Sequence, residues 1–187
     1  MKEFLKDKID RLLQEKERVV IAIDGPCAAG KSTLGAWLAK EFDCNVFHMD
    51  DFFLQPHQRT PKRLAEPGGN VDYERFRQEI LEPLKEGNAF AYRPYDCSTQ
   101  SLSEIVPVEP KKLNIVEGTY SHHPFFGESY DLRVFLPVSA ETQERRVRER
   151  PAFLHNRFFD EWIPMENAYF AAFSIREQCD LLLPESH

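Results

Sequence analysis

The chain has 187 residues, 42% of them hydrophobic, and a formal net charge of -7, a balance typical of one folded globular domain over residues 1–187. This acidic balance disfavours a nucleic-acid partner, and no apolar stretch is long enough to cross a membrane. The cysteines are scattered without metal-ligand spacing and the N-terminal residues show no signal-peptide pattern, so we expect a reduced, cytoplasmic protein. Self-association as a homo-oligomer stays open.

The first predicted element is an amphipathic helix over residues 1–17. Most of its positions are charged, and its apolar positions recur at helical spacing; these are Leu5, Ile9, Leu12 and Leu13. We expect the helix to pack on the surface of the domain, with a partner-binding helix as the alternative. A continuous β-branched run at 19–23 then predicts a buried parallel strand.

A glycine-bounded loop follows that strand and fits the phosphate-binding pattern G-x-x-x-x-G-K-S. Helical spacing resumes directly after it, so the loop has the strand and the helix that this motif requires on its two sides. Gly25 and Gly30 allow the backbone to curl so that its amides form an anion nest at the positive end of the helix. The predicted nucleotide-binding residues are Gly25, Pro26, Cys27, Ala28, Ala29, Gly30, Lys31, Ser32 and Thr33.

Three side chains of this loop carry separate expectations. Lys31 should reach the β- and γ-phosphates of a nucleotide from the solvent-facing mouth of the site, and Ser32 should hold Mg²⁺. Cys27 is expected to be a passive small residue, although positive potential from the loop could lower the pKa of its thiol.

An acidic pair, Asp50 and Asp51, ends the second predicted strand, which covers 45–49. Ligands of open α/β sheets bind outside the carboxyl ends of the strands, so an acid here is well placed to accept a proton from a sugar hydroxyl. Adjacent residues at a strand end point in opposite directions, and only one of the pair should face the phosphates. Turn formation and capping are the alternative role.

The stretch from 55 to 71 is rich in proline and glycine and is expected to be a long substrate-side loop. Asp72 then opens a helix, so an N-cap role is a strong alternative to a functional one. The inward positions of that helix are Phe76, Ile80, Leu81 and Leu84. Residues 90–92 and 105–108 are expected to pair across a β hairpin.

The third predicted strand, 113–118, carries Glu117 at its carboxyl end, where Walker B acids sit. This carboxylate should bind Mg²⁺ directly or through water, with a helix cap or a surface acid as the alternative. His122 and His123 follow without acidic or cysteine partners at ligand spacing, so we expect structural roles for them.

An arginine-rich helix is predicted over 140–150, after a fourth strand at 133–136, and Pro151 ends it. It belongs to a predicted lid region over 139–160. Guanidinium groups can clamp a transferring phosphoryl group, but glutamates at helical spacing could instead pair with them and leave a solvated charged face. Pro164 is expected at the first position of a later helix, and 180–183 as the fifth strand.

Strands that alternate with helices predict a three-layer α/β fold of the P-loop type. We expect a five-stranded parallel sheet covered by helices on both faces, with a short arginine-rich lid. A phosphate cradle, acids at strand ends and nearby arginines together predict phosphoryl transfer that uses ATP and Mg²⁺.

The chain resembles the uridine kinase-like branch of the P-loop kinases over most of its length, from Val19 to Leu183. This branch includes uridine-cytidine kinases, nicotinamide riboside kinases, phosphoribulokinases and bacterial pantothenate kinases. The phosphate loop alone is a superfamily feature, whereas the D-D-F-F and N-V-D-Y motifs narrow the resemblance to kinases of sugar hydroxyls. The matching segments are 25–33, 49–53, 70–73, 92–96 and 116–118.

The resemblance implies individual roles. Asp50 matches the catalytic base of the family, and Asp72 matches the acid that holds the ribose hydroxyls. Glu117 matches the Mg²⁺-associated acid, which would share the metal with Ser32 and Asp50. On the substrate side, the candidate hairpin residues are Arg93, Tyr95 and Asp96. In the lid region, the candidate arginines are Arg145, Arg146 and Arg150. The residues expected to take part in catalysis are Asp50, Lys31, Arg146 and Arg150.

The expected function is that of an ATP-dependent kinase acting on a hydroxyl of a small acceptor, most simply a nucleoside such as uridine or cytidine. Nicotinamide riboside, pantothenate and a nucleoside monophosphate are the alternative acceptors. A non-catalytic nucleotide-binding switch is the alternative from another class. A switch needs no acceptor base, and the joint presence of Asp50, Glu117 and the lid arginines disfavours it.

Overall fold

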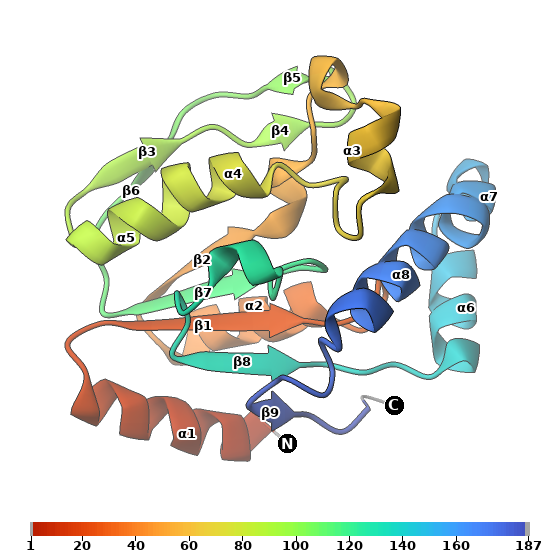
Figure 1. Cartoon of the computed structure of the whole chain (residues 1–187). Helices are drawn as coiled ribbons and strands as arrows, with labels where there is room; N and C mark the ends of the chain where they lie inside the picture. Colours follow the sequence, from red (N-terminus) through yellow and green to blue (C-terminus); the bar gives the residue numbers. More distant parts are fainter. Residues whose placement is uncertain (1, 186–187) are drawn as a thin grey trace.

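A five-stranded sheet in the order β2-β7-β1-β8-β9 forms the centre of the computed structural model, which describes residues 2–185 (Figure 1). Every pairing between its strands is parallel, as the alternation of strands and helices predicted. The strands are β1 (Val19–Asp24), β2 (Cys44–His48), β7 (Leu113–Glu117), β8 (Leu132–Phe135) and β9 (Leu181–Leu182).

Two apolar cores lie on opposite faces of this sheet, because alternate residues of each strand point to opposite sides. In β1, Ile21 enters one core and Val20 enters the other. The first core also receives buried side chains from α1 (Lys2–Glu15) and α2 (Lys31–Glu41). The second is covered by α4 (Tyr73–Phe76), α5 (Glu82–Glu86) and α8 (Ile163–Phe173), so helices cover both faces.

Helix α1 packs against the sheet through Leu5 and Ile9, which are fully buried, with Leu12 and Leu13 partly buried beside them. The apolar face of this amphipathic helix is therefore buried within this chain. The prediction for residue 1 lies outside the described residues. Among residues 2–185, no helix has the length and apolar character needed to cross a bilayer.

Two long helical runs each contain a π turn that ends two residues before a proline. Between α4 and α5 the turn covers Arg77–Leu81 and precedes Pro83, and between α7 (His155–Arg157) and α8 it covers Phe158–Trp162 and precedes Pro164. Proline has no N–H to donate and its ring crowds the preceding turn, so a wider turn keeps the helix continuous. Pro164 is the second residue of α8, one position from the predicted first, and the helical run that contains it begins further upstream, at His155.

The predicted hairpin is present as β3 (Phe90–Tyr92) paired with β6 (Val106–Val108), extended by β4 (Tyr95–Asp96) paired with β5 (Ser101–Leu102). Residues 55–71 differ from the expected loop, because they contain the short helices η2 (Pro56–Gln58) and α3 (Pro61–Ala65). Arg63 holds this stretch together: its guanidinium donates to the carbonyl oxygens of Gly69 and Val71, both at 3.0 Å. The arginine helix is α6 (Ala140–Arg148), followed by η5 (Ala152–Leu154).

Candidate active site at the carboxyl ends of the strands

The phosphate loop joins β1 to α2 through residues with left-handed backbone conformations. The φ angles are +147° at Gly25, +61° at Ala28 and +99° at Gly30. A Cβ atom on Gly25 would lie 2.2 Å from the carbonyl oxygen of Leu136, so only glycine fits at that position. Such a curled backbone at the start of a helix has the geometry of an anion nest.

Lys31 lies inside this loop, only 8% exposed, and not at the mouth of the site as predicted. Its ammonium donates to the carbonyl oxygens of Gly25 and Pro26, both at 2.8 Å, and to the hydroxyl of Thr119 at 3.1 Å. A buried ammonium needs acceptors, and the curled loop carbonyls provide them. The side chain is thus held within the loop that would receive a phosphate.

The two acids after β2 lie in different surroundings. The strand ends at His48, one residue earlier than predicted, and both acids belong to the 3₁₀ turn η1 (Met49–Phe52), where neighbours diverge by about 120° and not 180°. Asp50 interacts electrostatically with Lys31, Glu117 and Arg150. Crowding by the protein raises the pKa of Asp50 although water still reaches the side chain, while the Lys31 ammonium opposes that rise.

Asp51 faces the hairpin. The hydroxyl of Tyr92 donates to its carboxylate at 3.4 Å, and the guanidinium of Arg75 donates to its backbone oxygen at 2.7 Å. Arg75 also donates to the carbonyl oxygen of Arg93 at 3.1 Å, so it ties the turn after β2 to the hairpin. Partial burial raises the pKa of Asp51. Of the two acids, Asp50 is the one directed toward the phosphate loop.

Glu117 ends β7 beside β1 and is 3% exposed. One of its oxygens lies 2.5 Å from Nδ1 of His48, the last residue of the neighbouring strand β2, and this hydrogen bond raises the pKa of His48. The carboxylate of Glu117 also raises the pKa of Asp50, so two acids share one small region.

This donor set fits Mg²⁺, which binds proteins through one or two carboxylates and completes its shell with phosphates and water. The hydroxyl of Ser32, in the first turn of α2, and the carboxylates of Glu117 and Asp50 are the candidate ligands. Within residues 2–185, no cluster of three or more His, Cys, Asp or Glu side chains could hold a metal alone. The arrangement suits a cation that arrives with a nucleotide.

The arginines of α6 divide into two groups. Arg145 and Arg148 are 60% exposed and pair with Glu149 and Glu144 one turn away, which matches the alternative of a solvated face. Arg146 instead donates to the carbonyl oxygen of Ala28 in the phosphate loop at 2.9 Å.

Arg150, just after α6, stacks on Phe158 at 4.7 Å and interacts with Asp50. Of these arginines, Arg146 contacts the phosphate loop, and the charge of Arg150 acts on Asp50, where it opposes the rise in pKa.

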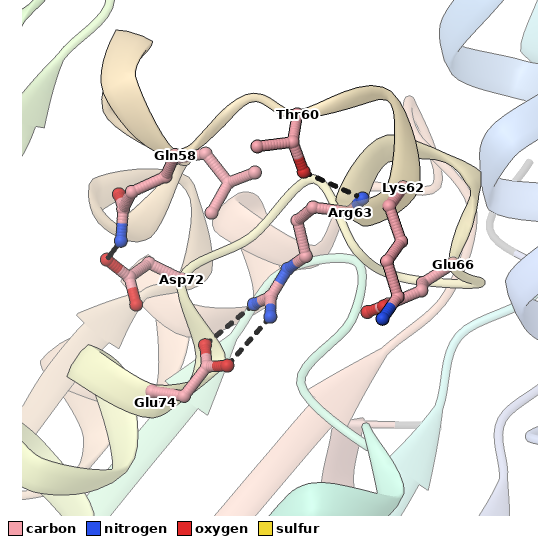
Figure 2. A pocket seen from close by; sticks show the side chains of 8 residues that line it. Gln58, Thr60, Lys62, Arg63, Glu66, Asp72 and Glu74 are labelled. Carbon is pink, nitrogen blue, oxygen red and sulfur yellow. Dashed lines mark hydrogen bonds and ion pairs between the residues drawn. The ribbon is translucent and has the colours of Figure 1, made fainter.

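Asp72 serves as an N-cap and also borders a cavity. One carboxylate oxygen accepts from the backbone N–H of Arg75 at 3.1 Å, and the other accepts from the side-chain amide of Gln58 at 2.7 Å. The cavity measures about 460 Å³, and Figure 2 shows the side chains that surround it. Its other lining residues are Leu54, Gln58, Thr60, Lys62, Arg63, Glu66 and Glu74. Lys31, Asp50 and Glu117 do not line it, so this cavity does not include the phosphate region.

The side chains of the candidate hairpin residues form most of their hydrogen bonds within the hairpin. The guanidinium of Arg93 donates to the carbonyl oxygens of Ser103 and Leu102 at 2.6 and 2.9 Å. The carboxylate of Asp96 accepts from the backbone and hydroxyl of Ser98, which lowers the pKa of Asp96. Tyr95 is buried, and its hydroxyl accepts from Arg59 at 3.0 Å.

Asp24, the last residue of β1, is a site residue that sequence reasoning did not select. It is fully buried, and its carboxylate accepts from the backbone of Gly25 at 2.6 Å, the backbone of His122 at 2.9 Å and the hydroxyl of Tyr169 at 2.8 Å. It therefore joins the phosphate loop to the turn after β7 and to α8. Its position as an acid at a strand end is the same signal that identified Asp50.

The two histidines after Glu117 are structural, as predicted. Besides its backbone bond to Asp24, His122 is buried with its ring against the carbonyl oxygen of Ala22 at 3.2 Å. His123 stacks on Tyr73 at 4.4 Å, and burial lowers its pKa to about 4.

Burial also raises the pKa of Cys27 to about 12, with the carboxylate of Glu166 adding to the rise. The thiol is therefore the passive small residue that we expected, and not an activated one.

Several comparisons identify the fold. The family model for shikimate kinase matches residues 27–89. A curated relative, a candidate uridine kinase of Schizosaccharomyces pombe, is 26% identical over 161 residues, which cover 74% of this chain and 68% of the relative. A candidate uridine kinase structure from Bacillus stearothermophilus has a TM-score of 0.69 at 20% identity and covers 96% of this chain and 99% of its own. A candidate fructose transport system kinase structure from Silicibacter sp. TM1040 has a TM-score of 0.68 at 22% identity and covers 98% of both chains.

Proposed function

We propose, from the premise that this chain has the P-loop kinase fold, that it transfers the γ-phosphoryl group of ATP to a hydroxyl of a small acceptor. The observation that carries the proposal is the convergence of three charged side chains on one region. Asp50 interacts with both Lys31 and Glu117, although the three come from separate elements. Phosphoryl transfer requires a phosphate cradle, a metal-binding acid and an acceptor base, and these residues have the matching chemistry.

The proposed reaction assigns a task to each of these residues, and Asp50 has two of them. The loop amides and the Lys31 ammonium bind and orient the phosphates, and Asp50 accepts the proton that leaves the acceptor hydroxyl as its oxygen attacks phosphorus. Arg146 and Arg150 lie where guanidinium groups can offset negative charge on the transferring group. When bound by Ser32, Glu117 and Asp50, Mg²⁺ would neutralise phosphate charge and align the leaving group.

A nucleoside such as uridine or cytidine is the acceptor that we favour. The support is the resemblance around Asp72, the cavity beside that residue, and the similarity to two candidate uridine kinases. In this proposal Asp72 binds the ribose hydroxyls, while Arg93, Tyr95 and Asp96 shape the hairpin side of the acceptor site. The free cysteines support the accompanying proposal of a cytoplasmic protein.

A panel of acceptors tests this function. With Mg²⁺ and ATP, we expect ADP release that depends on a nucleoside, and a smaller response to nicotinamide riboside, pantothenate or a nucleoside monophosphate. A coupled ADP assay measures the rates, and mass spectrometry of the product locates the new phosphate. ATP binding without acceptor-dependent ADP release would favour a nucleotide-binding switch instead.

Substitution of Asp72 separates its substrate role from its capping role. Asp72→Asn should raise the acceptor KM by about 10-fold or more and leave the ATP KM nearly unchanged, because a charged acceptor of ribose hydroxyl bonds is lost. Asparagine caps a helix about as well as aspartate, so the melting temperature should fall only slightly. Steady-state kinetics and thermal unfolding measure the two effects.

The control for Asp72 is Glu74→Gln, because Glu74 lines the same cavity and the substitution removes an equal negative charge. It also removes the ion pair between Glu74 and Arg63. If only Asp72→Asn raises the acceptor KM, the effect belongs to that carboxylate. Normal kinetics with a lowered melting temperature would show that Asp72 is a cap alone.

A further inference from the structure

A buried carboxylate from outside the phosphate loop accepts a hydrogen bond from one of the backbone amides of the loop. Glu166, in α8, is 6% exposed, and its Oε2 accepts from the backbone N–H of Cys27 at 2.8 Å. Its other oxygen lies 3.5 Å from the hydroxyl oxygen of Thr119. Cys27 is 139 residues away in sequence, so only the packing of α8 brings the acid here.

The neighbours of this carboxylate are the positive groups that a phosphate would use. Glu166 interacts electrostatically with Lys31, and both side chains contact the same hydroxyl of Thr119. Donors of an anion nest bind whichever anion reaches them. A nucleotide phosphate and the Glu166 carboxylate would therefore compete for the Cys27 amide and the Lys31 ammonium.

We propose that Glu166 is an internal anion that holds the phosphate loop before nucleotide binds and is displaced by the incoming phosphates. The inference rests on the proposed function in that the loop must be a nucleotide site. Two like charges in so small and buried a region repel strongly, so the carboxylate has to leave as the phosphates enter. A glutamate side chain can do so by rotating, while the Tyr169 hydroxyl bond to Asp24 keeps α8 in place.

Displacement has a consequence for nucleotide affinity and for the contacts of the helical run that carries Glu166. The phosphates must break the contact between Glu166 and Cys27 before they gain their own, which weakens nucleotide binding. Helix α8 follows α7 through a π turn, so release of Glu166 removes one contact between that helical run and the phosphate loop, while the bond from Tyr169 to Asp24 remains.

The test uses the full chain and inorganic pyrophosphate as the probe, with ADP as a second ligand. Glu166→Gln keeps an oxygen that can accept from the Cys27 amide but removes the charge, so pyrophosphate and ADP should bind about 10-fold more tightly, as measured by calorimetry. The control is Glu161→Gln in the same helical run, an exposed acid paired with Arg157, which should leave both affinities unchanged. Glu166→Ala, which also vacates the amide, is the second variant and should give the same direction.

Equal or weaker pyrophosphate binding by a folded Glu166→Gln protein would overturn the proposal and make Glu166 a permanent support of the loop. Failure of the wild type and the variants to bind pyrophosphate would overturn it as well. Tighter binding by the variant with no ADP release on any acceptor would leave the inference standing and refute the kinase function. Acceptor-dependent ADP release together with an unchanged pyrophosphate affinity of the variant would support the kinase function and overturn the inference about Glu166.

Discussion

Replacing Asp50 with asparagine should lower kcat and kcat/KM together by about 10²–10⁴-fold, while ATP still binds. Asparagine keeps the shape of the side chain but cannot accept the proton of an acceptor hydroxyl. Loss of a negative charge beside Lys31 and Glu117 should not weaken phosphate binding. Steady-state kinetics and an ATP titration of the same preparation measure the two effects.

The neighbouring acid provides the matched control. Asp51→Asn removes the same charge one residue along, but Asp51 faces Tyr92 and the hairpin. It should change kcat by only a few-fold. If Asp51→Asn were the inactive protein and Asp50→Asn were close to wild type, our assignment of the base would be wrong.

Replacing Lys31 with methionine should reduce turnover by about 10²–10³-fold or more, because the loop would lose its only side-chain cation and a donor aimed at the transferring charge. Methionine retains the length and apolar character of a side chain that is 8% exposed. Nucleotide affinity should fall as well, since the ammonium contributes to ground-state binding. The measurements are ADP release at saturating acceptor and calorimetric ATP binding.

The loop should keep its shape in this variant. The carbonyl oxygen of Gly25 still accepts from the hydroxyl of Thr119 at 2.9 Å, and that of Pro26 still accepts from the amide of Ala29 at 3.2 Å. A nearly unchanged melting temperature is therefore expected. Lys40→Met, at an exposed position of the same helix, is the control for general loss of charge. Full ADP release by Lys31→Met would contradict the kinase proposal.

Local patterns predicted most of the fold. The β-branched run at 19–23 became β1, and the apolar positions of α1 became its buried face, because burial of alternating or helically spaced residues is a local requirement. The predicted end of β2 and the predicted helix start at Pro164 each differ from the structure by one residue, and the helical run upstream of Pro164 was not predicted. The 3₁₀ turn after β2 depends on how the chain packs and leaves no clear trace in residue types, and the proline that accompanies each π turn is equally compatible with a helix start.

The sequence by itself determined the chemistry available to this protein. A glycine-bounded loop with Lys31 and Ser32, and acids such as Asp50 at the ends of apolar strands, follow from short motifs. The rules of parallel sheets place such residues at one edge.

The tertiary structure alone decided which groups meet. Arg146 contacts the phosphate loop and the charge of Arg150 acts on Asp50, while Arg145 and Arg148 pair with glutamates on the surface. All four lie on one short stretch, and only the docking of that stretch decides which of them meets the site. Glu166 reaches the Cys27 amide from α8, and no spacing in the sequence relates the two. Contacts between distant segments depend on the packing of whole helices against the sheet, and local residue patterns do not encode that packing.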